Sequence, residues 1–125
     1  MNYNIDLDVK FEQLELIDVP KIVGQVTEKW SNRTLTRVND SVVRLGIVEG
    51  EFHWHKHDKD DEFFYVTEGR LLMDYEDPIT KEVKTTELLP GQGITMPKGV
   101  MHRPRAPIKT VMLMVETSDI QPTGD

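Results

Sequence analysis

The chain has 125 residues, of which 38% are hydrophobic and 30% are charged, and its formal net charge is −7. This length suits one domain with its own core and is short for two. The acidic balance argues against a general affinity for nucleic acid or anionic membranes, because both need clustered Lys and Arg. The absence of cysteine excludes disulfides, thiolate metal sites and cysteine nucleophiles. It also fits a reducing compartment, so we expect a cytoplasmic protein.

Residues 1–20 form a predicted N-terminal extension. This segment is acidic and lacks the uninterrupted apolar run of a secretory signal. No apolar run in the chain approaches the roughly 20 residues needed to cross a bilayer. Leu7, Phe11, Leu14 and Ile17 lie close to helical spacing, which indicates a short helix. We expect the extension to pack outside the main fold.

Residues 21–117 form a predicted β domain. Short β-prone runs follow one another, separated by turn-forming pairs such as Asn39-Asp40 and Pro90-Gly91. This pattern predicts an all-β sandwich or barrel. The polar residues 118–125 are expected to form an extended tail on the surface. The β-prone runs are 21–26, 33–38, 41–50, 51–57, 62–69, 70–77, 81–89, 92–97 and 109–117.

Three of the four histidines alternate within the run 51–57. On a strand, His53, His55 and His57 would share one face, with neighbouring side chains about 6–7 Å apart. Isolated histidines are usually satisfied surface or core residues. Three imidazoles buried together without a metal, however, would leave costly unpaired polar groups. Because Glu62 and His102 offer further ligands from nearby β runs, the spacing favours a metal site.

Residues 55–69 (HKHDKDDEFFYVTEG) resemble the first motif of the cupin superfamily, in which His-x-His precedes three or four residues, Glu, six residues and Gly. His55, His57, Glu62 and Gly69 occupy these positions. The motif usually opens with a glycine separated from the first histidine by five residues, whereas four residues separate Gly50 from His55. We therefore expect a small rearrangement at that turn.

Residues 91–102 (GQGITMPKGVMH) resemble the second cupin motif. Gly91, Pro97, Gly99 and His102 match its spacing, but Ala106 stands where the motif usually closes with Asn. The resemblance implies a small single-domain cupin of the conserved-barrel, RmlC-like type, similar to sugar-phosphate isomerase-like cupins. Such proteins have an all-β double-stranded β-helix, or jelly-roll barrel.

The resemblance also implies that one divalent transition metal is bound by His55, His57, Glu62 and His102. Nitrogen-rich ligands suit Mn, Fe, Ni, Co or Zn better than Ca or Mg, which prefer all-oxygen shells. Pairing His53 with His55 instead would put Glu62 outside the family spacing. His53 is then a candidate catalytic residue as a proton acceptor, a donor to a ligand, or a capping residue at the barrel mouth.

Two functions remain open at this point. One is a metal-dependent enzyme of the dioxygenase, isomerase or lyase type acting on a small organic molecule, and the other is a noncatalytic module that binds or senses one. Phe64, Val66 and Met96 are expected to line an apolar pocket. Arg103 and Arg105 flank the last histidine and either attract an anionic ligand or lie on the surface. Cupin barrels of this size commonly pair, so the resemblance implies a homodimer, with residues 18–30 as the pairing strand.

Overall fold

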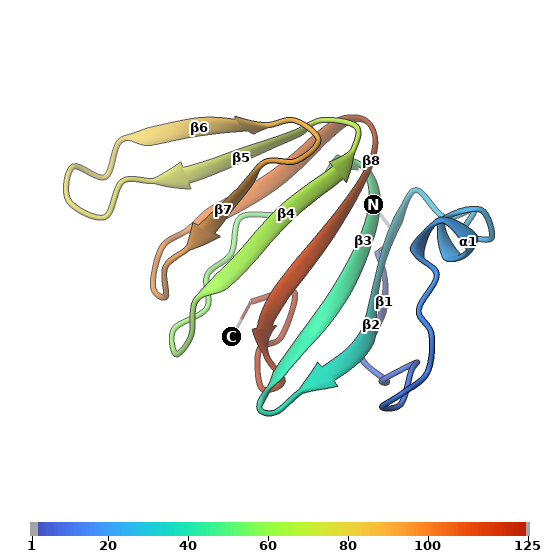
Figure 1. The fold of residues 1–125 in the computed structure, drawn as a ribbon. Helices are drawn as coiled ribbons and strands as arrows, with labels where there is room; N and C mark the ends of the chain where they lie inside the picture. The colour runs from blue at the N-terminus through green and yellow to red at the C-terminus, as the bar shows by residue number, and fades with distance from the viewer. Residues whose placement is uncertain (1–2, 125) are drawn as a thin grey trace.

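The computed structural model describes residues 3–124, which form eight strands and one short helix (Figure 1). The strands belong to one sheet with the order β1-β2-β3-β8-β4-β7, and β5 and β6 join it through β8. No helix in this part of the chain is long and apolar enough to cross a membrane. The elements are β1 (Asn4–Asp6), α1 (Val19–Val23), β2 (Trp30–Val38), β3 (Ser41–Glu51), β4 (Glu62–Glu68), β5 (Leu71–Glu76), β6 (Val83–Leu88), β7 (Gly93–Met96) and β8 (His102–Thr117).

Strand β8 connects the two halves of the rolled sheet. Its first residues, 102–105, pair with β5, whereas residues 105–117 pair with β3 and residues 111–115 also pair with β4. The β3–β8 register shifts between Val48 and Gly50, which marks a bulge that bends the strands. The sheet therefore curves over on itself and encloses a core (Figure 1).

The inner core contains side chains from both halves of the rolled sheet. Strand β4 alternates as predicted: Phe64 and Val66 are buried, and Phe63 and Tyr65 lie toward the outside. Burial of this many apolar side chains is the main force holding the barrel closed. The core residues are Trp30, Val48, Phe52, Phe64, Val66, Leu71, Met73, Leu88, Met96, Ala106, Met112 and Met114.

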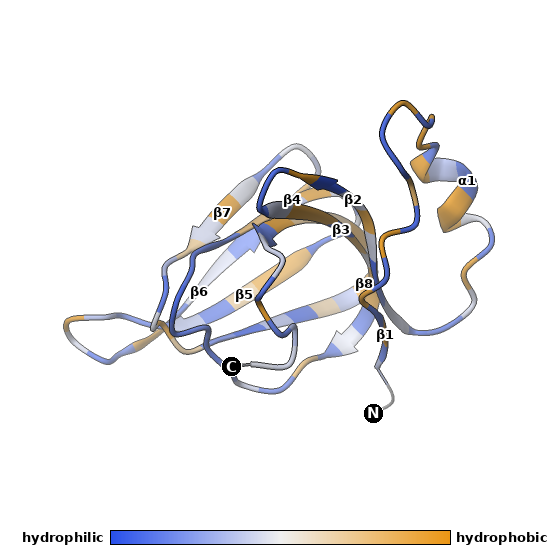
Figure 2. Cartoon of the chain, turned by 90° about the horizontal axis from the view of Figure 1, so that it is seen from below, coloured by the Kyte–Doolittle hydropathy of each residue, from blue (hydrophilic) through white to orange (hydrophobic). Residues whose placement is uncertain are grey.

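A second apolar cluster lies on the outer face of the sheet, where the N-terminal segment and α1 cover it. Leu45, Ile47 and Val111 from the sheet are buried there, and Phe11 and Ile22 pack against them. Figure 2 shows the apolar stretches of α1 and the chain before it standing beside the sheet. The prediction that the N-terminal segment packs outside the barrel is confirmed for residues 11–23, whereas β1 joins the sheet beside β2 and Tyr3 and Ile5 pack against the inner core.

The position of the predicted helix was wrong. Residues 7–17 contain no helix, and Leu14 is fully exposed with a φ of 69°. The helix instead forms at Val19–Val23, which overlaps the run 21–26 that was predicted to be a strand. Asp18 caps it by accepting a hydrogen bond from Lys21 N at 3.2 Å, and Pro20 lies in its first turn. A pairing strand over residues 18–30 is therefore also wrong.

The prediction of a surface tail after residue 117 was wrong in part. Ile120 is 1% exposed and Pro122 is buried, although Asp119, Gln121 and Thr123 between and beside them are exposed. Segment 118–124 therefore inserts two apolar side chains into the protein. A short polar sequence with only two such residues gave too weak a hydrophobic pattern to predict this packing.

Candidate metal centre

The histidine-rich segment is not a strand, contrary to the prediction. Strand β3 ends at Glu51, after Gly50 adopts a φ of 111°, and the chain to Asp61 follows an irregular path. His55 forms an isolated β-bridge with the start of β8: its N donates to His102 O at 3.0 Å, and its O accepts from His102 N at 2.8 Å. As a result His55 and His57 point inward, while the side chain of His53 is exposed.

The four predicted ligands converge at one end of the barrel. His55, His57, Glu62 and His102 are all buried, and each offers a ligand atom within 4.8 Å of the others. Glu62 Oε1 lies 3.2 Å from His57 Nε2 and 3.5 Å from His102 Nε2. Groups bound to one ion at 2.0–2.2 Å lie about 3–4 Å apart, so this spacing fits a single metal ion.

The tautomers of two histidines suit metal binding. His55 Nδ1 lies 3.0 Å from His53 O, and His102 Nδ1 lies 2.9 Å from Val100 O. A carbonyl oxygen only accepts hydrogen bonds, so both Nδ1 atoms carry a proton, which leaves the two Nε2 atoms to offer their lone pairs once a metal is bound. Burial, reinforced by nearby His102, lowers the pKa of His55 to about 4. The imidazole is therefore neutral near pH 7, as a ligand must be.

Glu62 is held as a carboxylate despite its burial. Burial alone would raise its pKa, but hydrogen bonds with His102 and His57 outweigh that effect and lower the pKa. Glu116 also contacts Glu62, and Arg44 Nε pairs with Glu116 Oε1 at 2.9 Å. The side chains of Arg44 and Glu116 are 3% and 0% exposed, so a buried ion pair lies directly behind the predicted ligand.

A small, mainly apolar cavity adjoins the cluster. Its volume is about 20 Å³, and His55 and Glu62 contribute to its wall. Phe64 lines it as predicted, whereas Val66 and Met96 belong to the surrounding core. The other lining residues are Trp30, Asn32, Val48, Phe52, Pro104, Met112, Met114 and Pro122.

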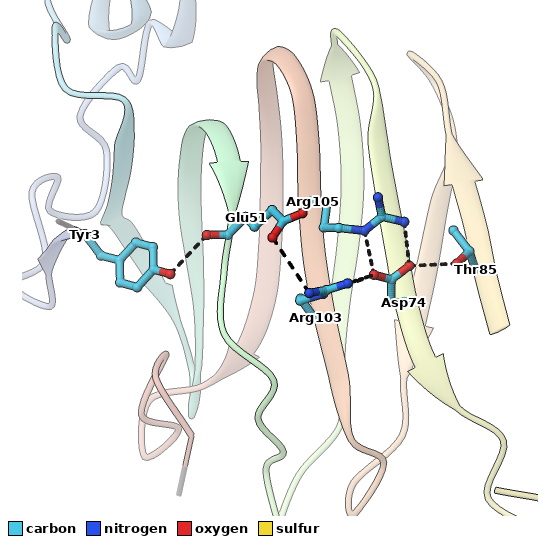
Figure 3. Close-up of polar contacts among 6 residues, drawn as sticks. All are labelled: Tyr3, Glu51, Asp74, Thr85, Arg103 and Arg105. Atoms are coloured by element: carbon cyan, nitrogen blue, oxygen red, sulfur yellow. Dashed lines mark hydrogen bonds and ion pairs between the residues drawn. The ribbon is translucent and has the colours of Figure 1, made fainter. Parts of the chain in front are cut away.

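The two arginines beside His102 do not reach the cluster. Both bind Asp74 on β5: Arg103 Nη2 lies 2.9 Å from Asp74 Oδ2 and Arg105 Nε lies 2.6 Å from the same oxygen (Figure 3). Thr85 also donates to Asp74 Oδ1, and the guanidinium of Arg103 lies 5.1 Å from the ring of Trp54. The arginines are therefore partly exposed structural partners, which agrees with the surface alternative.

Sequence reasoning missed three buried charged residues: Asp74, Arg44 and Glu116. Each interrupts an otherwise apolar β run, in LLMDYE, VVRLGIV and VMLMVET respectively. A charge at such a position indicates a buried partner, because an unpaired buried charge is too costly. That signal could have identified the residues, although not their partners.

A rolled β barrel that buries three imidazoles and one carboxylate at one end is the arrangement of a cupin with a possible metal site. Residues 41–117, more than half of the chain, match the family model described as Cupin domain. The chain therefore belongs to the cupin family, and the predicted jelly-roll fold is confirmed.

Two similar proteins support this assignment, and a third shares the fold. The uncharacterised protein YdbB of Bacillus subtilis (strain 168) is 42% identical over 95 residues, covering 76% of this chain and 80% of YdbB. A cupin-2 domain containing protein from Shewanella frigidimarina is 32% identical, with a TM-score of 0.73 over 82% of this chain and 94% of that one. CapF, solved with the inhibitor 3-isopropenyl-tropolone, is 18% identical, with a TM-score of 0.66 over 78% of this chain and 30% of CapF. The likeness to CapF concerns the fold alone.

Proposed function

We propose that this cupin binds one divalent transition metal through His55, His57, Glu62 and His102, and that a small organic molecule binds beside it. The observation that carries the proposal is the convergence of four buried ligand atoms within 4.8 Å of one another. Three neutral imidazoles and one carboxylate would leave a divalent ion with a net charge near +1. The candidate ions are Mn, Fe, Ni, Co and Zn.

The first candidate function is a metal-dependent enzyme of the dioxygenase, isomerase or lyase type. When bound, the metal supplies a Lewis acid or a redox centre. The protein's own residues would orient the ligand and exclude water: Trp30, Phe52 and Phe64 supply apolar walls beside His55. A dry, apolar surrounding strengthens electrostatic interactions inside the site.

The second candidate function is a noncatalytic module that binds or senses a small molecule. One observation favours it: among the described residues, the only titratable side chains that line the cavity are His55 and Glu62, which are themselves predicted ligands. A separate general acid or base is therefore missing from the cavity wall in this arrangement. The ligand-bound structure of CapF is consistent with small-molecule binding by either kind of protein.

The experiment that separates these functions begins with the metal content of the purified protein. The protein loaded with that metal is then screened against aromatic diols, β-diketones and sugar phosphates. Turnover that His57→Ala abolishes supports the enzyme, whereas tight ligand binding without turnover supports the module. A protein that takes up none of the candidate metals would overturn both.

We also propose that the protein forms a homodimer. Phe63 and Val115 are paired across β4 and β8, and with Tyr65 they leave an apolar strip 37–38% exposed on the outer face of the sheet. Exposed apolar strips of this kind often mark interfaces. Sedimentation at micromolar concentration would show a dimer that Tyr65→Lys converts to monomer, and a monomeric parent protein would contradict the proposal.

A further inference from the structure

Segment 118–124 runs back across the end of the barrel that holds the histidine cluster. Near its start, Ser118 N donates to Asp40 O at 3.0 Å and Arg44 Nη2 donates to Ile120 O at 3.4 Å. Near its end, His53 Nε2 lies 2.7 Å from Thr123 O and therefore acts as the donor. The segment is thus fixed at two points by residues from other parts of the chain.

The side chains of this segment alternate between the barrel and the solvent. Ile120 and Pro122 are buried, whereas Asp119, Gln121 and Thr123 are exposed. This alternation is that of an extended chain with one face against the protein, and Ile120 and Pro122 lie on that face.

The segment directly contacts the candidate metal centre. Pro122 lines the same cavity as His55 and Glu62. The backbone of Gly124 lies so close that an added Cβ would be 3.1 Å from His55 Cβ. Segment 118–124 is therefore one wall of the space beside the predicted ligands.

This space is too small for an organic ligand while the segment lies across it. The cavity measures about 20 Å³, which is room for about one water molecule. Pockets that bind small organic molecules typically measure about 300–1,000 Å³. The segment can move without disturbing the sheet, because it leaves β8 only after Thr117.

We propose that segment 118–124 is a displaceable wall that controls which molecules reach the metal. An organic ligand binds only when the segment moves away, and it then occupies the space that Ile120 and Pro122 fill in this structure. His53 holds the segment in place through Thr123 O and so acts as a positioning residue. This inference rests on the proposed function, since it assumes a metal and an organic ligand at the cluster.

The test uses the full chain loaded with Co²⁺, whose visible absorption reports both metal uptake and ligand binding. Benzohydroxamate, a planar ligand with two oxygen donors, serves as the organic probe. The variant Ile120→Gly/Pro122→Gly removes both inward side chains. The matched control, Asp119→Gly/Gln121→Gly, loosens the same segment at outward positions. A third variant, His53→Ala, removes the hydrogen bond to Thr123 O together with the stacking of the imidazole on Phe52.

The organic ligand binds only to molecules in which segment 118–124 has moved away, so its apparent affinity rises when more molecules are in that state. Benzohydroxamate should therefore bind Ile120→Gly/Pro122→Gly about tenfold more tightly than the parent. The control should stay within about twofold of the parent, and His53→Ala should gain about threefold. Equal gains in the inward and outward variants, or no gain in His53→Ala, would overturn the proposal. Should the inward variant fail to fold, the His53→Ala result alone decides. A parent protein that takes up no Co²⁺ would instead refute the proposed function.

Discussion

His55 and His102 hydrogen-bond to each other through both of their backbone N–H and C=O groups, at 3.0 and 2.8 Å. This isolated bridge joins the irregular segment after β3 to the start of β8. Each imidazole is oriented in addition by its own Nδ1, which bonds to a backbone carbonyl two residues earlier. Two predicted ligands from distant parts of the sequence are therefore oriented by hydrogen bonds to the backbone, without help from a metal.

The four clustered residues should each be needed for metal binding. Replacing His55, His57 or His102 with Ala should remove most of the bound metal. Glu62→Gln should weaken binding about 10–100-fold, because a neutral amide lacks the charge of the carboxylate. Metal content by mass spectrometry and competition titrations would measure both effects. The control is Asp61→Asn: its carboxylate accepts a hydrogen bond from Lys98 N and lies outside the cluster, so metal content should not change.

His53→Ala tests which histidines are the ligands. The side chain of His53 is exposed and bonds to Thr123 O rather than joining the cluster, so metal content should equal that of the parent. Of the three roles predicted for His53, the barrel-mouth role agrees with this contact and stays a prediction. If His53→Ala empties the site and His57→Ala does not, the assignment of ligands is wrong.

The turn between β4 and β5 should tolerate no side chain at Gly69. This residue has a φ of 89°, and a Cβ there would lie 2.5 Å from Lys109 O. We expect Gly69→Ala to lower the free energy of unfolding by about 3 kcal/mol or more, since strain and a backbone clash add. Gly91→Ala is the matched control: φ is 87° but nothing lies within 4 Å, so only about 1 kcal/mol is expected. If urea unfolding shows that Gly69→Ala and Gly91→Ala lose the same unfolding free energy, the clash at Gly69 relaxes without cost.

The fold and the clustered residues were predictable because both depend on short-range spacing. The pattern from His55 to Glu62 and the turn before His102 were read from the sequence, and the structure brings these residues together. The path of the chain between them was not predicted. A strand was expected through His53, but the bend after Gly50 ends β3, and alternation of residue types cannot reveal a bend.

The remaining differences have a common physical origin in long-range contacts and capping. Helical spacing over residues 7–17 was overridden, because Asp18 and Pro20 supply a better helix start than the earlier segment. The burial of Ile120 depends on the far end of the barrel, and the ion pair of Arg44 with Glu116 depends on the register of β3 against β8. The cap at Asp18 is a local signal, but the last two contacts join residues far apart in the sequence, and no local pattern contains them.

Removing only one partner of the buried ion pair between Arg44 and Glu116, which lies beside Glu62, should lower the stability of the protein. Arg44→Met leaves the Glu116 carboxylate buried beside Glu62 without its cation, and we expect a loss of about 3–5 kcal/mol of unfolding free energy. Adding Glu116→Leu should recover much of that loss, because the uncompensated charge is then gone. Urea unfolding of the parent, both single variants and the double variant forms the cycle. Additive losses would mean that the two side chains are not coupled.

Asp74 should make stability depend on pH in a defined acidic range. Burial alone would raise its pKa, but hydrogen bonds from Arg105, Thr85 and Arg103 lower it from 3.8 to about 2. The carboxylate therefore stabilises the folded state above pH 3.8, and this contribution is lost as the pH falls toward 2.

The variant Asp74→Asn removes this contribution at every pH. Above pH 5 it should be less stable than the parent by about 2 kcal/mol, the free energy that corresponds to such a shift in pKa. The two arginines are 27% and 28% exposed, and Arg103 keeps its pair with Glu51, so little further loss is expected. Urea unfolding of both proteins at pH 6, 4 and 2.5 measures the difference, which should shrink toward zero at the lowest pH. A difference that stays constant over this range would show that the carboxylate of Asp74 is not favoured by its arginine partners.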